Sequence, residues 1–242
     1  MKKNNNLSDK KTFNLILQAK GGAGKSFLTY LLALKNETNK DSFFVDLDNS
    51  TKTSTNQLQF LIEEERVADI NLANRENKID RERLFNVLEH LNEFNKFNTF
   101  FLDCGAPESE QIPNLFNVDF SPEELKEFEE QLDATIIFNI VVAGGSAYTS
   151  CMSYLEKILV LNGLFTINIY INEYTFNTTP DLIEEAEKIG LNMNLGVKKF
   201  GKIYPDRQSG QEILINAKKG LGLSNYSSFA AKTQLKRELK TI

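Results

Sequence analysis

The sequence predicts an α/β protein in which a mostly parallel, twisted sheet is covered by helices on both faces. Short apolar runs alternate with amphipathic stretches along the whole chain, a pattern typical of buried parallel strands between helices. A glycine-rich turn at residues 20–24 joins one apolar run directly to an amphipathic stretch. Both observations favour strands and helices in alternation rather than an all-helical or all-strand protein.

Length and composition set the scale of this fold. The 242 residues are 41% hydrophobic and 25% charged, which is ordinary for a soluble globular protein. A chain of this length fits one α/β domain better than two, and no repeat, long linker or low-complexity tract divides it. We expect one domain over residues 11–242 and a disordered segment over residues 1–10.

Apolar runs of five to nine residues are the expected strands, and amphipathic stretches are the expected helices. The strands are Phe13–Ala19, Ser42–Asp46, Val67–Leu72, Thr99–Asp103, Thr135–Ala143 and Thr166–Asn172. The helices are Lys25–Leu34, Leu58–Glu65, Arg81–Phe94, Glu123–Leu132, Ala147–Leu161, Pro180–Ile189, Gln211–Lys218 and Ser227–Leu239. Ser121 before Pro122, and Thr179 before Pro180, are typical helix starts.

Cysteine and histidine give little support to metal or disulfide chemistry. Cys104 and Cys151 have no spacing typical of a disulfide framework or a zinc site. The single histidine, His90, lies in a stretch with helical spacing and is expected on a helix surface. The apolar runs 13–19 and 134–143 are too short for a signal peptide or a membrane span, so we expect a cytoplasmic protein.

The segment around residue 20 carries the main functional signal. An apolar run leads into Lys20-Gly21-Gly22-Ala23-Gly24-Lys25-Ser26, and Phe27 continues into an amphipathic stretch. This strand–turn–helix order is that of a phosphate-binding loop, or P-loop, whose glycines let successive N–H groups point at phosphate oxygens. Lys25 is expected to reach the β- and γ-phosphates and the Ser26 hydroxyl to bind Mg²⁺. Residues 21–27 are therefore predicted to bind ATP with Mg²⁺.

With these residues the loop resembles the deviant Walker A motif of the ParA/MinD family of ATPases, commonly Lys-Gly-Gly-Val-Gly-Lys-Thr. The resemblance implies a P-loop NTPase fold, an ATP-dependent homodimer and slow hydrolysis of ATP to ADP and phosphate. Lys20 matches the signature lysine of the family, which reaches across the dimer as an arginine finger would. Ala19 stands where the general pattern has Gly, and the stretch 17–20 looks closer to proteins encoded with conjugative-transfer genes.

Two further motifs follow in the order that the family shows. Asp46-Leu47-Asp48 is similar to the Asp-x-Asp switch, and residues 99–107 look like the Walker B strand and second switch. By resemblance, Asp48 positions or deprotonates the attacking water, and Asp46 supports the Mg²⁺ shell. Asp103 would hold Mg²⁺ through water, because a carboxylate at the carboxyl end of a strand faces the nucleotide crevice.

Base recognition is predicted from two positions. Asn172 ends an apolar run where the family often has an adenine-binding Asn, and an amide can both donate to and accept from the purine edge. Ile203-Tyr204-Pro205 resembles the Ile-Pro segment that packs on the base in the family. Asn172 and Pro205 are therefore expected at the base.

Charge is unevenly placed. Residues 198–242 hold ten Lys and Arg against three Asp and Glu, a net charge of +7, which leaves −12 for residues 1–197. This basic segment suits nucleic acid, anionic lipid or an acidic partner, or forms a solvated helical face. Helical spacing near the end sets apolar residues against lysines, namely Phe229, Leu235, Leu239 and Ile242 against Lys232, Lys236 and Lys240. We expect docking on the core ahead of non-specific DNA binding, and DNA ahead of membrane contact.

The motifs together favour an ATP-driven dimerisation switch that positions or segregates a plasmid, a chromosome or conjugative-transfer machinery, with a partner protein that activates hydrolysis. Two alternatives stay open. A metabolic phosphotransferase or ligase on the same scaffold would need a second cluster of acceptor-site residues, and no such cluster stands out. A nucleotide-binding scaffold without turnover would not need both Asp48 and Asp103.

Overall fold

The centre of the protein is a parallel sheet. The computed structural model describes residues 10–48, 53–76 and 78–242. The strands in this part of the chain are β1 (Lys11–Leu17), β2 (Ser42–Asp46), β3 (Val67–Asp69), β4 (Thr99–Asp103), β5 (Ala134–Val142), β6 (Thr166–Asn172) and β7 (Gly196–Phe200). All pair in parallel, in the order β3-β2-β4-β1-β5-β6-β7. The predicted fold class is confirmed.

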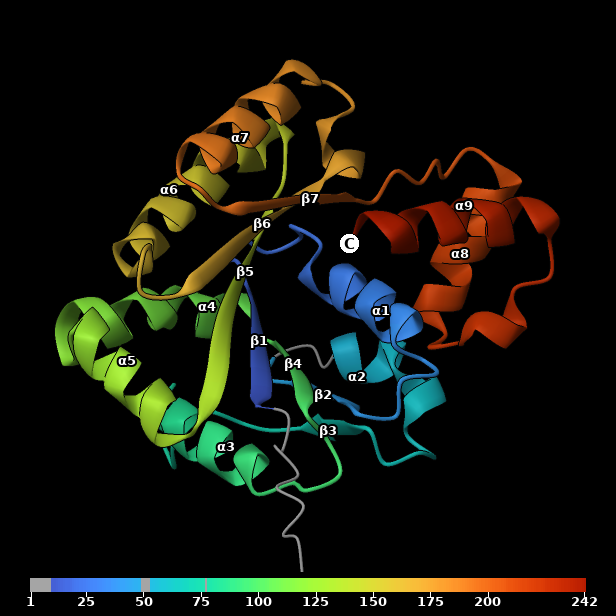
Figure 1. Ribbon diagram of the computed structural model, residues 1–242. Helices are drawn as coiled ribbons and strands as arrows, with labels where there is room; N and C mark the ends of the chain where they lie inside the picture. The colour runs from blue at the N-terminus through green and yellow to red at the C-terminus, as the bar shows by residue number, and fades with distance from the viewer. Residues whose placement is uncertain (1–9, 49–52, 77) are drawn as a thin grey trace, which may run out of the picture.

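Helices cover both faces of this sheet. Among the described residues they are α1 (Lys25–Lys35), α2 (Thr53–Gln57), α3 (Arg83–Asn92), α4 (Ala106–Asn114), α5 (Pro122–Gln131), α6 (Tyr148–Ile158), α7 (Asp181–Asn192), α8 (Gln208–Lys218) and α9 (Phe229–Thr241). Figure 1 shows α1, α8 and α9 on one side of the sheet and α4, α5 and α6 on the other. None of the described helices is both long enough and apolar enough to cross a membrane.

The strand register brings three loops to one place. The central strand β1 lies between β4 and β5. Asp103, the last residue of β4, is paired with Asp46 of β2 on one side and with Ile16 of β1 on the other. Because parallel strands point the same way, the loops that follow β1, β2 and β4 meet at the carboxyl edge of the sheet, where α/β proteins bind ligands.

Apolar side chains bury both faces of the sheet, as the continuous apolar runs predict. Successive residues of a strand point to opposite faces, so Phe100 and Phe101 of β4 serve different layers. Phe100 stacks on Phe13 of β1 and Phe101 on Phe44 of β2, both with ring centroids 4.9 Å apart. This core fixes the edge that carries the loops.

Most predicted elements are confirmed, and three of the strands have the predicted bounds: Ser42–Asp46, Thr99–Asp103 and Thr166–Asn172. The first strand ends at Leu17 instead of Ala19, because Gln18 already belongs to the turn. Ser121 caps α5 with a capping box to Glu124. Thr179 does not cap α7, and its hydroxyl accepts a hydrogen bond from the Gly145 N–H at 3.3 Å instead.

Three elements differ from the predictions. The helix expected over Leu58–Glu65 is wrong: α2 ends at Gln57, a 3₁₀ turn follows, and Glu65 has a φ of 55° that no helix continues. Strand β7 was not predicted, because its sequence Gly-Val-Lys-Lys-Phe lacks an apolar run. Its lysines have polar partners at this edge of the sheet: Lys198 contacts the Tyr170 hydroxyl, and Lys199 pairs with Glu187. Helix α4 was not predicted because it contains Pro113, which breaks most helices.

The C-terminal helix α9 packs on the core, as expected. Leu235 and Ile242 are 2% and 4% exposed, and α9 contacts α1, α8 and β7. Phe229, expected on the same apolar side, is 85% exposed, because it lies seven residues, about two helical turns, before Lys236 and therefore on the lysine side of the helix. The lysines of the opposite side remain exposed.

Arg66 holds the connection between α1 and β2. Its side chain is 1% exposed and lies just before β3. The guanidinium donates to four backbone carbonyls, those of Asn36 (2.8 Å), Glu37 (2.9 Å), Asn39 (2.8 Å) and Ser42 (3.0 Å). These oxygens follow the end of α1, where backbone acceptors have no helical partner. Arg66 therefore replaces the missing donors of that helix end.

Candidate nucleotide-binding site

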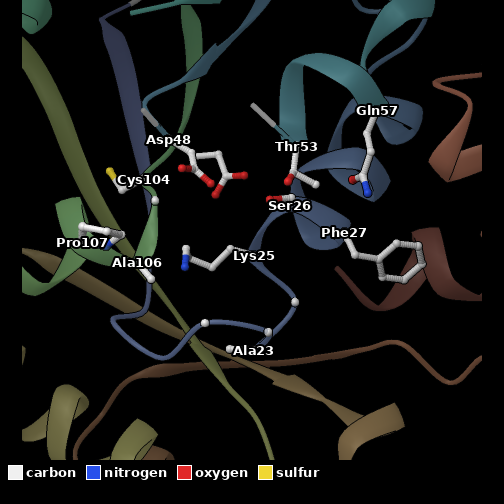
Figure 2. Close-up of a pocket in the computed structure, with 15 residues that line it drawn as sticks. Ala23, Lys25, Ser26, Phe27, Asp48, Thr53, Gln57, Cys104, Ala106 and Pro107 are labelled. Atoms are coloured by element: carbon white, nitrogen blue, oxygen red, sulfur yellow. The ribbon is translucent and has the colours of Figure 1, made fainter. Parts of the chain in front are cut away.

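The three loops at the carboxyl edge enclose a cavity of about 470 Å³. Its wall consists of residues 21–27 after β1, of Asp48, Thr53 and Gln57 after β2, and of residues 103–107 after β4 (Figure 2). Residues 49–52 lie outside the described part of the chain. The structure thus brings together the three motifs that the sequence singles out, although they are tens of residues apart.

The P-loop presents the open end of α1 to this cavity. Gly24 caps the helix, has a φ of 105° and supplies no side-chain acceptor for the first N–H groups. A side chain at this position would also collide with the Asn172 amide. Within the described structure, the first N–H groups of α1 therefore have no side-chain cap. They and the positive end of the helix dipole lie at the cavity, which suits an anion.

Lys25 adds a positive charge inside the same cavity. Its ammonium donates a hydrogen bond to the Gln18 carbonyl at 2.7 Å, and the residue is 8% exposed. Burial lowers the pKa of Lys25, and the nearby Asp103 and Asp48 carboxylates oppose this shift. The ammonium thus contacts the backbone at the start of the P-loop and lies at the cavity that an anion would fill.

Gln18 organises the loop and was missed by the sequence analysis. Its side chain is fully buried. The amide donates to the Val141 carbonyl of β5 at 2.7 Å and accepts from the Lys20 N–H at 3.2 Å. Gln18 therefore connects the backbone of Lys20 to the neighbouring strand. Its partner Val141 is far away in sequence, so no local pattern indicates this role.

Asp103 and two hydroxyls form the acidic side of the cavity. The Ser54 hydroxyl donates to Asp103 Oδ2, and Ser26 also hydrogen-bonds to this carboxylate. Burial raises the pKa of Asp103 to about 6, against these hydrogen bonds and the charge of Lys25. Ser54 was not predicted as a site residue, because α2 was expected further along the chain.

These residues fit Mg²⁺. Asp103 Oδ1 is buried and has no hydrogen-bond partner among the described residues, so it is an orphaned acceptor beside the Ser26 hydroxyl. Hydroxyl and carboxylate oxygens are the ligands that Mg²⁺ prefers, together with phosphate oxygens and water. The described chain has no group of three or more His, Cys, Asp or Glu that could hold a metal ion, so phosphate oxygens and water would have to complete the Mg²⁺ shell.

Asp46 and Asp48 have different surroundings. Asp48 lines the cavity, and Gly105 lets it approach closely, because a Cβ at position 105 would lie 3.1 Å from Asp48 Cα. Asp46 is fully buried, does not line the cavity, and accepts from Thr55 N–H (2.7 Å), Thr55 Oγ1 (2.9 Å) and Asp48 N–H (3.0 Å). Asp46 thus holds α2 and the backbone of Asp48, and its part in a Mg²⁺ shell stays a prediction.

A second cavity of about 320 Å³ adjoins the first. The two share Gly22, Gly24, Phe27 and Gln57 in their walls. Asn172 lines the second cavity and is 5% exposed; its Nδ2 donates to the Ala23 carbonyl at 2.9 Å, while its Oδ1 is buried without a described partner. Asn172, which the sequence predicts at the base, therefore has an oxygen acceptor available to a ligand in the second cavity.

Two other predicted residues lie differently from Asn172. Pro205 is absent from the lining of both cavities, and Ile203, two residues earlier, lines the second one. The chain turns at Gly201, which has a φ of 80°, so the apolar contact comes earlier than expected. Lys20 is exposed and its side chain lies outside the cavity wall. A role for either residue at the nucleotide stays a prediction.

Glu238 of α9 fixes the loop that carries Ile203. Its carboxylate is 6% exposed and accepts from the Gly201 N–H at 2.8 Å and the Lys202 N–H at 3.3 Å. Burial raises the pKa of Glu238, and these two hydrogen bonds oppose that shift. The C-terminal helix is in this way connected to the second cavity.

The raised pKa of Glu238 gives a stability prediction. A carboxyl whose pKa is higher in the folded than in the unfolded protein stabilises the fold below its unfolded pKa, and this contribution is lost as the pH rises through the folded pKa. Glu238→Gln keeps an acceptor without the buried charge. We expect the variant to melt above the wild type at pH 8 and to lose that advantage near pH 4, as measured by thermal unfolding across this range. A variant that melts below the wild type at pH 8 would contradict the sign.

The fold and the loop define the class of protein. An all-parallel sheet of seven described strands, with the P-loop after its central strand and helices on both faces, is an α/β P-loop NTPase-like fold. No family model and no curated protein matches the sequence. The class is therefore defined by structure.

Within this class, the chain has the fold of MinD and of plasmid partition proteins. MinD in the MinC:MinD cell division complex of Aquifex aeolicus is 10% identical, with a TM-score of 0.55 over 95% of this chain and 94% of that one. The MinD cell division protein of Aquifex aeolicus on its own is 9% identical, with a TM-score of 0.51 over 95% of each chain. A protein described as a plasmid partition protein from Borrelia burgdorferi, bound to AMPPNP, is 14% identical. Its TM-score is 0.54 over 96% of this chain and 98% of that one. The resemblance to the ParA/MinD type is confirmed at the level of fold.

Proposed function

We propose that this protein is a Mg²⁺-dependent ATPase that works as an ATP-controlled dimerisation switch. The observation that carries the proposal is the convergence of Lys25, Ser26, Asp48 and Asp103 on one cavity at the open end of α1 (Figure 2). Backbone N–H groups, an ammonium and two carboxylates in this arrangement match what triphosphate binding and hydrolysis need.

The residues divide the chemistry among themselves. The first N–H groups of α1 and the Lys25 ammonium would bind the phosphates, Lys25 exchanging the Gln18 carbonyl for phosphate oxygens. Ser26 and Asp103 would hold Mg²⁺, which neutralises phosphate charge when bound. Asp48 would orient the attacking water. Among the described residues, few reactive groups besides these line the cavity, which supports slow turnover suited to a timer.

The second cavity supports adenine as the base. Asn172 Oδ1 is a buried acceptor without a described partner, and the 6-amino group of adenine is a donor that would satisfy it. Guanine would present its O6 acceptor at the same position. Two acceptors facing each other in a buried site cost free energy, so we propose that ATP binds in preference to GTP.

A dimer and a cargo complete the proposal. Lys20 is exposed at the rim of the P-loop, which suits a cation that reaches the phosphates of a second copy. The fold shared with plasmid partition proteins and MinD supports partition or positioning of plasmid, chromosome or conjugative-transfer machinery, and the MinC:MinD complex supports a partner protein. The exposed lysines of α9, Lys232, Lys236 and Lys240, support non-specific DNA as the surface on which the switch acts.

Light scattering tests the switch on a variant that binds ATP without consuming it. Asp48→Ala is expected to stay monomeric with Mg²⁺ and ADP and to become dimeric with Mg²⁺ and ATP. The same dimer should bind DNA at low salt and leave it as salt rises. The double variant with Lys20→Ala serves as control and should remain monomeric in ATP.

Two outcomes would separate the parts of the proposal. An Asp48→Ala protein that binds ATP by calorimetry and yet stays monomeric would refute the dimer and leave the nucleotide site standing. A wild type that binds ATP and produces no ADP, with or without DNA, would favour the scaffold alternative over the ATPase.

A further inference from the structure

Gln57 occupies the boundary between the two cavities. It is the last residue of α2, and with Gly22, Gly24 and Phe27 it belongs to both cavity walls. Of these four shared residues it alone has a polar side chain. In Figure 2 its amide extends from α2 toward Ser26 and Phe27. A polar group thus lies at the passage between the phosphate side and the base side of the site.

The amide of Gln57 lacks the partner that its burial calls for. Its Oε1 is buried and accepts no hydrogen bond within the described structure. A buried acceptor that stays unpaired costs about 1–3 kcal/mol, and such groups in proteins are usually satisfied by protein, water or ligand. Asp103 Oδ1 and Asn172 Oδ1 share this state, and both face the proposed nucleotide. Gln57 lines both the cavity that Asp103 lines and the cavity that Asn172 lines.

Taking the proposed function as its basis, we propose that Gln57 accepts a hydrogen bond from a ribose hydroxyl. The site would then bind a nucleotide that lacks this hydroxyl more weakly. A nucleotide with its phosphates in the first cavity and its base in the second must pass its sugar along their shared wall. A ribose there offers two hydroxyl donors, of which the 2′-hydroxyl is missing from deoxyribonucleotides. The Gln57 carbonyl is the acceptor that this wall provides.

The position of Gln57 also links the sugar to the Mg²⁺ side of the site. Gln57 ends the short helix α2, whose Ser54 donates to Asp103 and whose Thr55 is bound by Asp46 through N–H and hydroxyl. A ribose bound at Gln57 therefore contacts the same helix that contacts the Walker B carboxylate. A sugar lacking this contact would leave the Gln57 acceptor unpaired.

Calorimetry with ADP, 2′-deoxy-ADP and 3′-deoxy-ADP in Mg²⁺ tests the inference without hydrolysis or ATP-dependent dimerisation. Wild-type protein is expected to bind at least one deoxy analogue about three- to tenfold more weakly than ADP, the effect of one hydrogen bond. Gln57→Leu keeps the side chain out to the δ position and removes the amide oxygen and nitrogen. The variant should bind ADP about three- to tenfold more weakly than wild type and bind all three nucleotides equally.

Gln59→Leu is the matched control. Gln59 is exposed just beyond α2 and lines neither cavity, so this variant should keep the wild-type preference. Thermal melting shows whether both variants fold. Equal wild-type affinity for ADP and both deoxy analogues, or an unchanged preference in folded Gln57→Leu, would overturn the inference. Wild-type protein that binds none of the nucleotides would instead refute the proposed function.

Discussion

Lys25→Met is expected to abolish useful ATP binding. The variant keeps the length and apolar stem of the side chain and removes the ammonium, which lies inside the cavity 2.7 Å from the Gln18 carbonyl. Removing one partner of a buried, hydrogen-bonded charge pair costs about 2–5 kcal/mol, which weakens binding at least about thirtyfold. Calorimetry with Mg²⁺ and ATP measures the loss, and ADP production should fall to background.

Folding and binding respond differently to this variant. Burial lowers the pKa of Lys25, so the free protein already carries a cost for that charge. Lys25→Met should therefore melt no lower than the wild type without nucleotide. Lys20→Ala is the matched control, because Lys20 is exposed outside the cavity wall: monomers of this variant should bind ATP almost normally. Near-normal affinity of Lys25→Met would remove the electrostatic basis of the site.

The parts of the fold and site that sequence predicts are those encoded locally. The P-loop is one unbroken stretch, so the spacing of its glycines, Lys25 and Ser26 is enough to predict that they line one cavity. Strands such as Thr99–Asp103 are apolar throughout because both faces of a parallel sheet are buried. Asp48 and Asp103 follow from their places at strand ends. In each of these cases the residue and its structural reason lie within a few positions of one another.

The parts that sequence misses depend on distant partners. Gln18 acts through Val141 of β5, and Ser54 acts through Asp103; neither pairing leaves a periodic signal. The helix α2 was placed too late in the chain because its Thr-Ser-Thr start is stabilised by the Asp46 carboxylate more than by helix propensity. Gln57 was not predicted as a site residue for the same reason, because it lines the two cavities only through the position of α2.

Arg66→Lys is expected to cause a large loss of stability although it conserves the charge. Arg66 is an example of a residue whose importance has no sequence signal: a charged side chain is seldom fully buried. Its guanidinium serves four carbonyls between residues 36 and 42 at 2.8–3.0 Å. A lysine ammonium is a compact donor without the planar fork and cannot reach the same four oxygens. At least two buried acceptors would lose their donor, each at about 1–3 kcal/mol.

We expect the free energy of unfolding to fall by about 2–4 kcal/mol, a large part of the ~5–15 kcal/mol that usually stabilises a domain. Urea denaturation measures the change as a lower midpoint with an unchanged slope. Arg237→Lys on α9 is the control, because Arg237 is exposed and the same chemical change there should leave the midpoint in place. The connection that Arg66 holds precedes β2, the strand that ends in Asp46 and leads to Asp48. The variant should therefore also lose ATP binding at urea concentrations that leave wild-type binding intact. A free energy of unfolding within about 1 kcal/mol of the wild type would show that other contacts hold the connection.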